Sequence, residues 1–215
     1  LFGSEKHKSV TIAFLNTMLE YTGDRKIVSI EFMNNEQLPT TLEKKENILD
    51  ISCLDQSNRH FIIEMHNGWE RGFTKRILWY GAKKYVDQLN AAKPYDSLDP
   101  VIVLAITKRF KVFQKREAYK SMYTLADTKT GERDIPELTL VFAELLKFKK
   151  EEHELVTDED KWLFLLNKIG EYEETPPALQ EGEFNEACQA LNRLTWSEKE
   201  VELYQKMMIK AQSQE

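Results

Sequence analysis

The sequence lacks long apolar runs, has few cysteines and carries none of the common short catalytic motifs. No stretch approaches the eighteen uncharged apolar residues of a membrane-spanning helix. A glycine-rich phosphate loop, a Ser-His-Asp order and a zinc-spaced histidine pair are also missing. These absences argue against a membrane protein, a nucleotide-binding P-loop protein and a serine hydrolase.

The two cysteines, Cys53 and Cys188, have no Cys or His at metal-ligand spacing nearby. We therefore expect reduced thiols in a reducing compartment and a cytoplasmic protein.

The composition is that of a globular protein with an uneven charge distribution. Of 215 residues, 41% are hydrophobic and 31% charged, with a net charge of −6. Residues 71–120 contain 12 basic and 4 acidic residues, whereas residues 151–215 contain 6 basic and 16 acidic ones. Nucleic-acid binding needs a local positive surface rather than a positive whole, so the middle segment is the candidate for such a contact.

Hydrophobic periodicity predicts an α/β order of elements. An amphipathic helix is expected over 5–21, strands over 26–34, 47–54, 59–66, 100–107 and 138–148, a helix over 69–90, and further helices over 158–171, 183–194 and 197–211. The core side of the helix over 69–90 is expected to carry Leu78, Ala82, Tyr85 and Leu89, which step by 4, 3 and 4 residues. This order predicts a mixed α/β domain over residues 1–150 and an acidic helical region over 151–215.

A predicted hairpin, residues 47–66, places two carboxylates inside strands. If Leu54 pairs with His60 across the turn, Asp50 lies opposite Glu64, with about 5 Å between their Cβ atoms. His66 shares the face of Glu64, because side chains alternate along a strand. Like charges so placed destabilise a sheet unless the face is solvated, a Lys or Arg lies between them, or both bind a divalent metal. The spacing leaves these three interpretations open.

Several motifs occur in an order that resembles a known family. They are FLN at 14–16, ILDI at 48–51, FIIEMH at 61–66, RILWY at 76–80, YVDQL at 85–89, PVIVLAI at 100–106 and DEDKWLFLL at 158–166. Over about residues 2–170 the chain resembles the transposase-associated branch of the PD-(D/E)XK nuclease superfamily, the recombination-promoting nucleases.

The resemblance implies a restriction-endonuclease-like fold, in which helices flank a mixed sheet and a helical extension follows. It also implies DNA phosphodiester hydrolysis with Mg²⁺, for which Mn²⁺ substitutes. Asp50 and Glu64 would be the metal ligands, and His66 stands where the superfamily usually has Lys and this branch often has Gln. Glu5 falls where many members supply an extra acidic group, although an exposed glutamate at a helix N-terminus fits as well. A hydrogen-bonded strand histidine is the alternative for His66.

Basic residues in the middle segment are candidates for DNA contacts. Arg76, Tyr80 and Lys83 step by 4 and 3 residues on a helix face rotated from the expected core side, so they could bind phosphate. The stretch over 108–117 mixes Phe110 and Phe113 with five basic residues. A solvated helix face and aromatic side chains packed into the core are the alternatives.

The sequence therefore predicts a Mg²⁺-dependent DNA endonuclease. DNA is the expected partner, no membrane association is expected, and the choice between monomer and homo-oligomer stays open. The rival prediction is a DNA-binding or protein-interaction module that has kept the nuclease fold and lost turnover. Metal-dependent cleavage of DNA separates the two.

Overall fold

The computed structural model describes residues 2–33, 51–89, 94–168 and 174–191. The chain separates into two compact units, Phe2–Lys149 and, with Leu1, Lys150–Glu215. Asp50 and the predicted helix over 197–211 lie outside the described residues.

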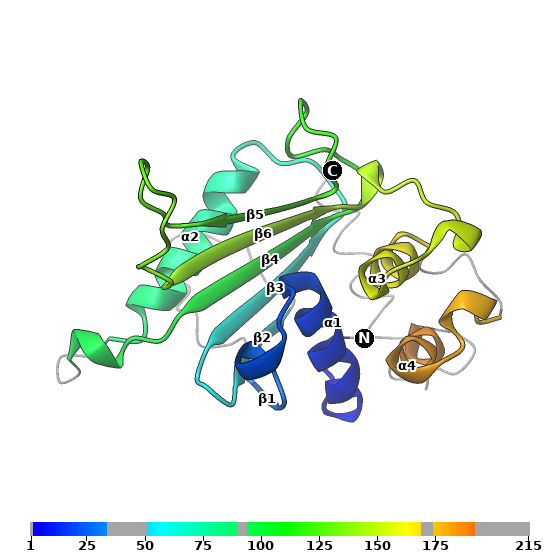
Figure 1. Cartoon of the computed structure of the whole chain (residues 1–215), viewed down its shortest axis with the longest axis horizontal. Coiled ribbons are helices and arrows are strands. Elements are labelled where there is room, and N and C mark those ends of the chain that lie inside the picture. The colour runs from blue at the N-terminus through cyan, green and yellow to red at the C-terminus, as the bar shows by residue number, and fades with distance from the viewer. Residues whose placement is uncertain (1, 34–50, 90–93, 169–173, 192–215) are drawn as a thin grey trace. The chain divides into compact units, whose positions relative to one another are not determined.

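The first unit is a mixed six-stranded sheet with helices on both faces (Figure 1). The strand order is β1-β2-β3-β4-β6-β5; β3, β4 and β6 are parallel, and the other neighbours are antiparallel. The elements are α1 (Lys8–Leu19), β1 (Ile30–Phe32), β2 (Ile51–Asp55), β3 (His60–His66), α2 (Phe73–Val86), β4 (Val101–Thr107), β5 (Lys120–Thr124) and β6 (Leu138–Glu144), with short 3-10 turns Glu5–His7, Gly23–Arg25, Tyr95–Ser97 and Leu145–Lys147. This architecture is the expected restriction-endonuclease-like α/β fold.

The turn between β2 and β3 fixes the hairpin register. The carboxylate of Asp55 accepts hydrogen bonds from the backbone N–H groups of Ser57 and Arg59, both at 2.9 Å, and from Nε of Arg59 at 2.7 Å. Leu54 then pairs with His60, and Ile51 with Ile63. The predicted register is confirmed for the four pairs from residue 51 to residue 54.

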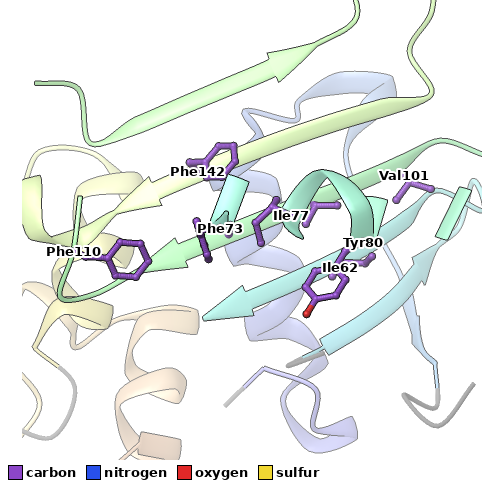
Figure 2. Close-up of a cluster of buried hydrophobic side chains, with 9 residues drawn as sticks. Ile62, Phe73, Ile77, Tyr80, Val101, Phe110 and Phe142 are labelled. Carbon is purple, nitrogen blue, oxygen red and sulfur yellow. The ribbon is translucent and has the colours of Figure 1, made fainter. Parts of the chain in front are cut away.

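One face of the sheet packs against α2 through a hydrophobic cluster (Figure 2). Because α2 runs so close to the sheet, a Cβ added to Gly81 would lie 2.6 Å from Cδ1 of Leu138 and 3.1 Å from Cγ2 of Val103. The buried members of the cluster are Ile62, Phe73, Ile77, Tyr80, Val101, Val103, Ala105, Phe110 and Phe142.

The prediction for the core side of α2 is confirmed for Tyr85, which packs against the hydrophobic cluster, and is wrong for Leu78 and Ala82. Leu78 is 47% exposed and Ala82 is exposed, whereas Tyr80 is only 4% exposed and belongs to the hydrophobic cluster. The helix packs through Phe73, Ile77, Tyr80 and Gly81 instead. A buried Tyr80 cannot meet DNA in this structure, so its role is that of a core residue.

The opposite face of the sheet carries α1, which Figure 1 shows on the side away from α2. The helix buries Val10, Phe14, Leu15 and Met18 completely. Asn16, on the last turns of the same helix, forms two hydrogen bonds of 2.8 Å with the backbone of Ile27, and these fix the path of the chain into β1.

Two strands differ from the sequence prediction. The strand expected over 26–34 is only Ile30–Phe32 long, and β5 was not predicted. None of the five residues of β5 is fully buried. An edge strand of this kind lacks the apolar alternation on which strand prediction depends.

The second unit contains α3 (Asp158–Asn167) and α4 (Gly182–Leu191), with 3-10 turns at Glu152–Glu154 and Pro177–Leu179. Thr157 and Asp160 form a reciprocal capping box at the start of α3. Trp162 of α3 packs against Phe184 of α4, with 4.7 Å between ring centroids. None of the described helices is long and apolar enough to cross a membrane.

Candidate active site

Polar side chains gather where the parallel strands end. The register aligns His66 of β3 with Thr107 of β4, and Thr107 with Glu144 of β6. Alternation places these three residues on the face of the sheet that packs against α2. Glu64 lies on the same face two residues earlier, opposite Ala105.

Glu64 is a buried carboxylate with one oxygen in use. Its residue is 3% exposed, and Oε2 lies 3.0 Å from Nε2 of His66. Oε1 is buried and has no hydrogen-bond partner among the described residues. An ionised oxygen in such a place is costly unless a hydrogen-bond donor or a cation occupies it.

Arg76, in the first turn of α2, brings a guanidinium to His66. One of its terminal nitrogens lies 3.0 Å from Nδ1 and 2.7 Å from Nε2 of the ring, and the other contacts the carboxylate of Glu70. Phe73 meets the same ring edge-on, with 5.2 Å between centroids. Arg76 thus lies beside the predicted catalytic residues, on the helix face that packs against the sheet.

The partners of His66 bear on which of its ring nitrogens carries a hydrogen. Ionised Glu64 can only accept a hydrogen bond, and Arg76 can only donate. A neutral ring with its hydrogen on Nε2 would donate to Glu64 and accept from Arg76 at Nδ1, although the same Arg76 nitrogen also lies 2.7 Å from Nε2. These contacts agree equally with the alternative of a hydrogen-bonded strand histidine, and the structure adds the Arg76 guanidinium to its partners.

Two other predicted site residues lie apart from this group. Glu5 is paired with Lys8 at 2.6 Å and its side chain is 71% exposed, which matches the interpretation as an exposed helix N-terminal glutamate. Lys83 is two turns beyond Arg76, about 10 Å along the helix axis, and pairs with Asp87 at 2.8 Å. Neither side chain reaches Glu64 through the contacts described here.

The structure reveals a buried ion pair that sequence reasoning missed. Nζ of Lys147 lies 2.7 Å from Oε1 of Glu144, and the two side chains are 2% and 1% exposed. The only signal in the sequence was a Glu-x-x-Lys spacing at the end of a predicted strand, which is too common to single out.

A known protein family matches nearly the whole chain. The family described as PD-(D/E)XK nuclease family transposase matches residues 1–214. The chain belongs to this family. No curated protein and no solved structure matches the chain.

Within residues 2–33, 51–89, 94–168 and 174–191, no three His, Cys, Asp or Glu side chains form a metal-binding group.

Proposed function

We propose that the protein is a divalent-metal-dependent DNA endonuclease whose metal is held by Asp50 and Glu64. The observation that carries the proposal is the buried Oε1 of Glu64, which has no hydrogen-bond partner in the part of the chain that the structure describes. A carboxylate oxygen is the ligand that Mg²⁺ and Mn²⁺ prefer. The family to which the chain belongs makes a DNA phosphodiester the expected substrate.

Asp50 lies outside the described residues, and the register supports its part in the proposal. The four pairs from Ile51↔Ile63 to Leu54↔His60 have residue numbers with a constant sum. If the same sum held one residue further, Asp50 would pair with Glu64, and the proposal that Asp50 is the second metal ligand depends on that pairing.

When bound, a divalent ion would stabilise the charge on the phosphodiester and make a bound water more acidic. The residues of the chain prepare this chemistry. His66 holds Oε2 of Glu64, so that Oε1 is the oxygen left for the ion. Arg76 supplies a permanent positive charge beside His66, which the superfamily usually obtains from a lysine at position 66.

Cleavage of supercoiled plasmid tests the proposal. The native protein should nick or linearise DNA with Mg²⁺ or Mn²⁺ and not with EDTA. Glu64→Gln should lower the rate by more than about 100-fold, because it removes a direct ligand rather than a supporting contact. The matched control is Glu132→Gln, since Glu132 is an exposed glutamate in the loop after β5 and its substitution should leave the rate unchanged.

The rival is a module that binds DNA or protein without turnover. It is favoured if the native protein binds duplex DNA and leaves it intact with either metal ion. The rival is also favoured if Glu64→Gln cleaves at the native rate, because the observed cleavage would then not depend on the proposed metal ligand.

A further inference from the structure

The loop that follows β4 starts at the candidate active site. We define the basic loop as residues 108–118, of which Lys108, Arg109, Lys111, Lys115 and Arg116 are basic and Glu117 is acidic. The backbone N–H of Lys108 donates to the carbonyl of His66 at 2.9 Å. Thr107 then donates through Oγ1 to the carbonyl of Phe110 at 3.1 Å. The loop is thus attached directly to the strand that carries Glu64.

The buried Glu144–Lys147 pair holds the middle of this loop. Oε2 of Glu144 accepts from the backbone N–H groups of Val112, at 2.6 Å, and Phe113, at 3.2 Å. Nζ of Lys147 donates to the carbonyls of Phe113, at 2.9 Å, and Ala118, at 3.4 Å, as well as to Glu144. All three donors of the ammonium group are therefore used.

A buried ion pair is costly, because both charges leave water. Here the two side chains satisfy four backbone groups of one surface loop, so what they secure is the conformation of that loop. A loop fixed before binding loses less entropy when it meets a ligand.

The aromatic side chains of the basic loop pack inward, and two of its cationic side chains are exposed. Phe110 packs edge-on against Phe73, at 5.3 Å between centroids (Figure 2). Phe113 packs against Phe142, at 5.2 Å between centroids. Arg109 and Lys115 are exposed, and within the described part of the chain they form no hydrogen bond or ion pair. Arg109 and Lys115 thus present positive charge to solvent from a loop whose backbone is held by Glu144 and Lys147.

We propose that the basic loop binds the backbone phosphates of the DNA strand beside the bond to be cleaved, and that Glu144 and Lys147 are its positioning residues. The ligand follows from the chemistry: two exposed cations without paired acids among the described residues, Arg109 and Lys115, suit a regularly charged phosphodiester chain. The attachment to His66 places this contact at the catalytic edge. The inference rests on the proposed function only in taking DNA as the substrate.

The test measures binding rather than cleavage. A short fluorescent DNA duplex is titrated with the full chain in EDTA at several salt concentrations, and the slope of log K against log[salt] is determined. Arg109→Ala/Lys115→Ala should weaken binding and reduce the slope by about two units if each cation contacts one phosphate.

The matched control is Lys129→Ala/Arg133→Ala, which removes the same charge from the loop between β5 and β6. Both residues are exposed and precede Leu138, the first residue of β6. Leu138 lies about 20 Å along the strand from Glu144, at the end of β6 away from the basic loop. The control should leave the slope unchanged. Equal slopes for the two double variants, no change in either, or no binding by the native protein would overturn the proposal.

A double-mutant cycle tests the positioning role. Glu144→Gln should lower the slope, and adding it to Arg109→Ala/Lys115→Ala should cause little further loss, because the released loop no longer presents those cations. Additive losses would show that Glu144 acts independently of the loop. Should Glu144→Gln fail to fold, the exposed double variant still decides the phosphate contact. If the two double variants have equal salt slopes while the native protein still cleaves DNA with Mg²⁺, only the phosphate contact of the basic loop is overturned. If the slopes differ as expected but the native protein does not cleave DNA, only the proposed endonuclease activity is overturned.

Discussion

The guanidinium of Arg76 lies 3.0 Å from Nδ1 of His66, so a permanent positive charge from α2 adjoins the residue that follows Glu64 by two positions in β3. Position 66 carries lysine in most of the superfamily that the chain resembles. His66 has an imidazole ring in place of the permanently charged ammonium group of lysine. The permanent charge comes instead from Arg76, on α2. Under the proposed function, His66 and Arg76 together would supply what one lysine supplies elsewhere in the superfamily.

This division predicts a rescue. Arg76→Ala should lower the rate of plasmid cleavage by at least about 10-fold, and adding His66→Lys should recover part of it, because the lysine restores the lost charge. Arg71→Ala is the matched control, since Arg71 is an exposed arginine of the same segment. A full loss in the double variant, or an equal loss in the control, would show that charge beside Glu64 is not what Arg76 provides.

His66→Gln should retain partial activity. A glutamine amide can donate to Glu64 and accept from Arg76, as the neutral ring does. The rate of plasmid cleavage by this variant with Mg²⁺ should lie below the native rate and above that of His66→Ala, because alanine can make neither hydrogen bond. Native rates for His66→Ala at every pH would remove His66 from the catalytic set.

The corrected orientation of α2 is tested by stability. Tyr80→Ala should lower the free energy of unfolding by about 3–5 kcal/mol, because it empties a site in the hydrophobic cluster. Leu78→Ala, on the exposed side of the same helix, should change it by less than about 1 kcal/mol. Urea unfolding followed by circular dichroism measures both. The reverse order of the two losses would restore the face that periodicity predicted.

Removing one partner of the buried ion pair should be costly. Lys147→Met leaves the carboxylate of Glu144 buried without its cation and should destabilise the protein by about 3–5 kcal/mol. The double variant Glu144→Gln/Lys147→Met should be more stable than Lys147→Met alone, since no uncompensated charge remains. Urea unfolding of the two variants decides between this account and simple loss of packing, which would make the double variant worse.

Stability should fall in mildly acidic solution because of His60. Burial, together with the positive charge of Lys84, lowers the pKa of His60 from its ordinary 6.5 to about 4. Between these values the unfolded chain binds a proton that the folded chain does not, so His60 destabilises the fold as pH falls from 6.5 towards 4. The slope due to His60 is at most about 1.4 kcal/mol per pH unit. His60→Gln should flatten the urea-unfolding profile in this window, and His153→Gln, at an exposed site, should not.

The hairpin and its face could be predicted from the sequence because their causes are local. The composition of the DQSN turn fixes which residues pair, and alternation then assigns Glu64 and His66 to one face. The fully apolar strand β4 could be predicted for the same reason, since burial on both faces leaves an uninterrupted run.

The side of α2 that packs on the sheet could not be predicted, because apolar residues lie on both sides of the helix. Leu78 and Trp79 are exposed, while Phe73 and Ile77 are buried. Periodicity detects a helix but cannot choose between two apolar stripes. Arg76 was identified as a candidate for phosphate contact, yet its contacts with His66 and Glu70 depend on the packing of the helix.

A crystal soaked in Mn²⁺ tests the central claim most directly. The account predicts an anomalous difference peak within coordination distance of Oε1 of Glu64 and of a carboxylate oxygen of Asp50, about 2.0–2.3 Å from each. The peak should disappear in Glu64→Gln. Absence of Mn²⁺ at Glu64, at a metal concentration that supports DNA cleavage by the native protein, would contradict the assignment of the two carboxylates as the metal site.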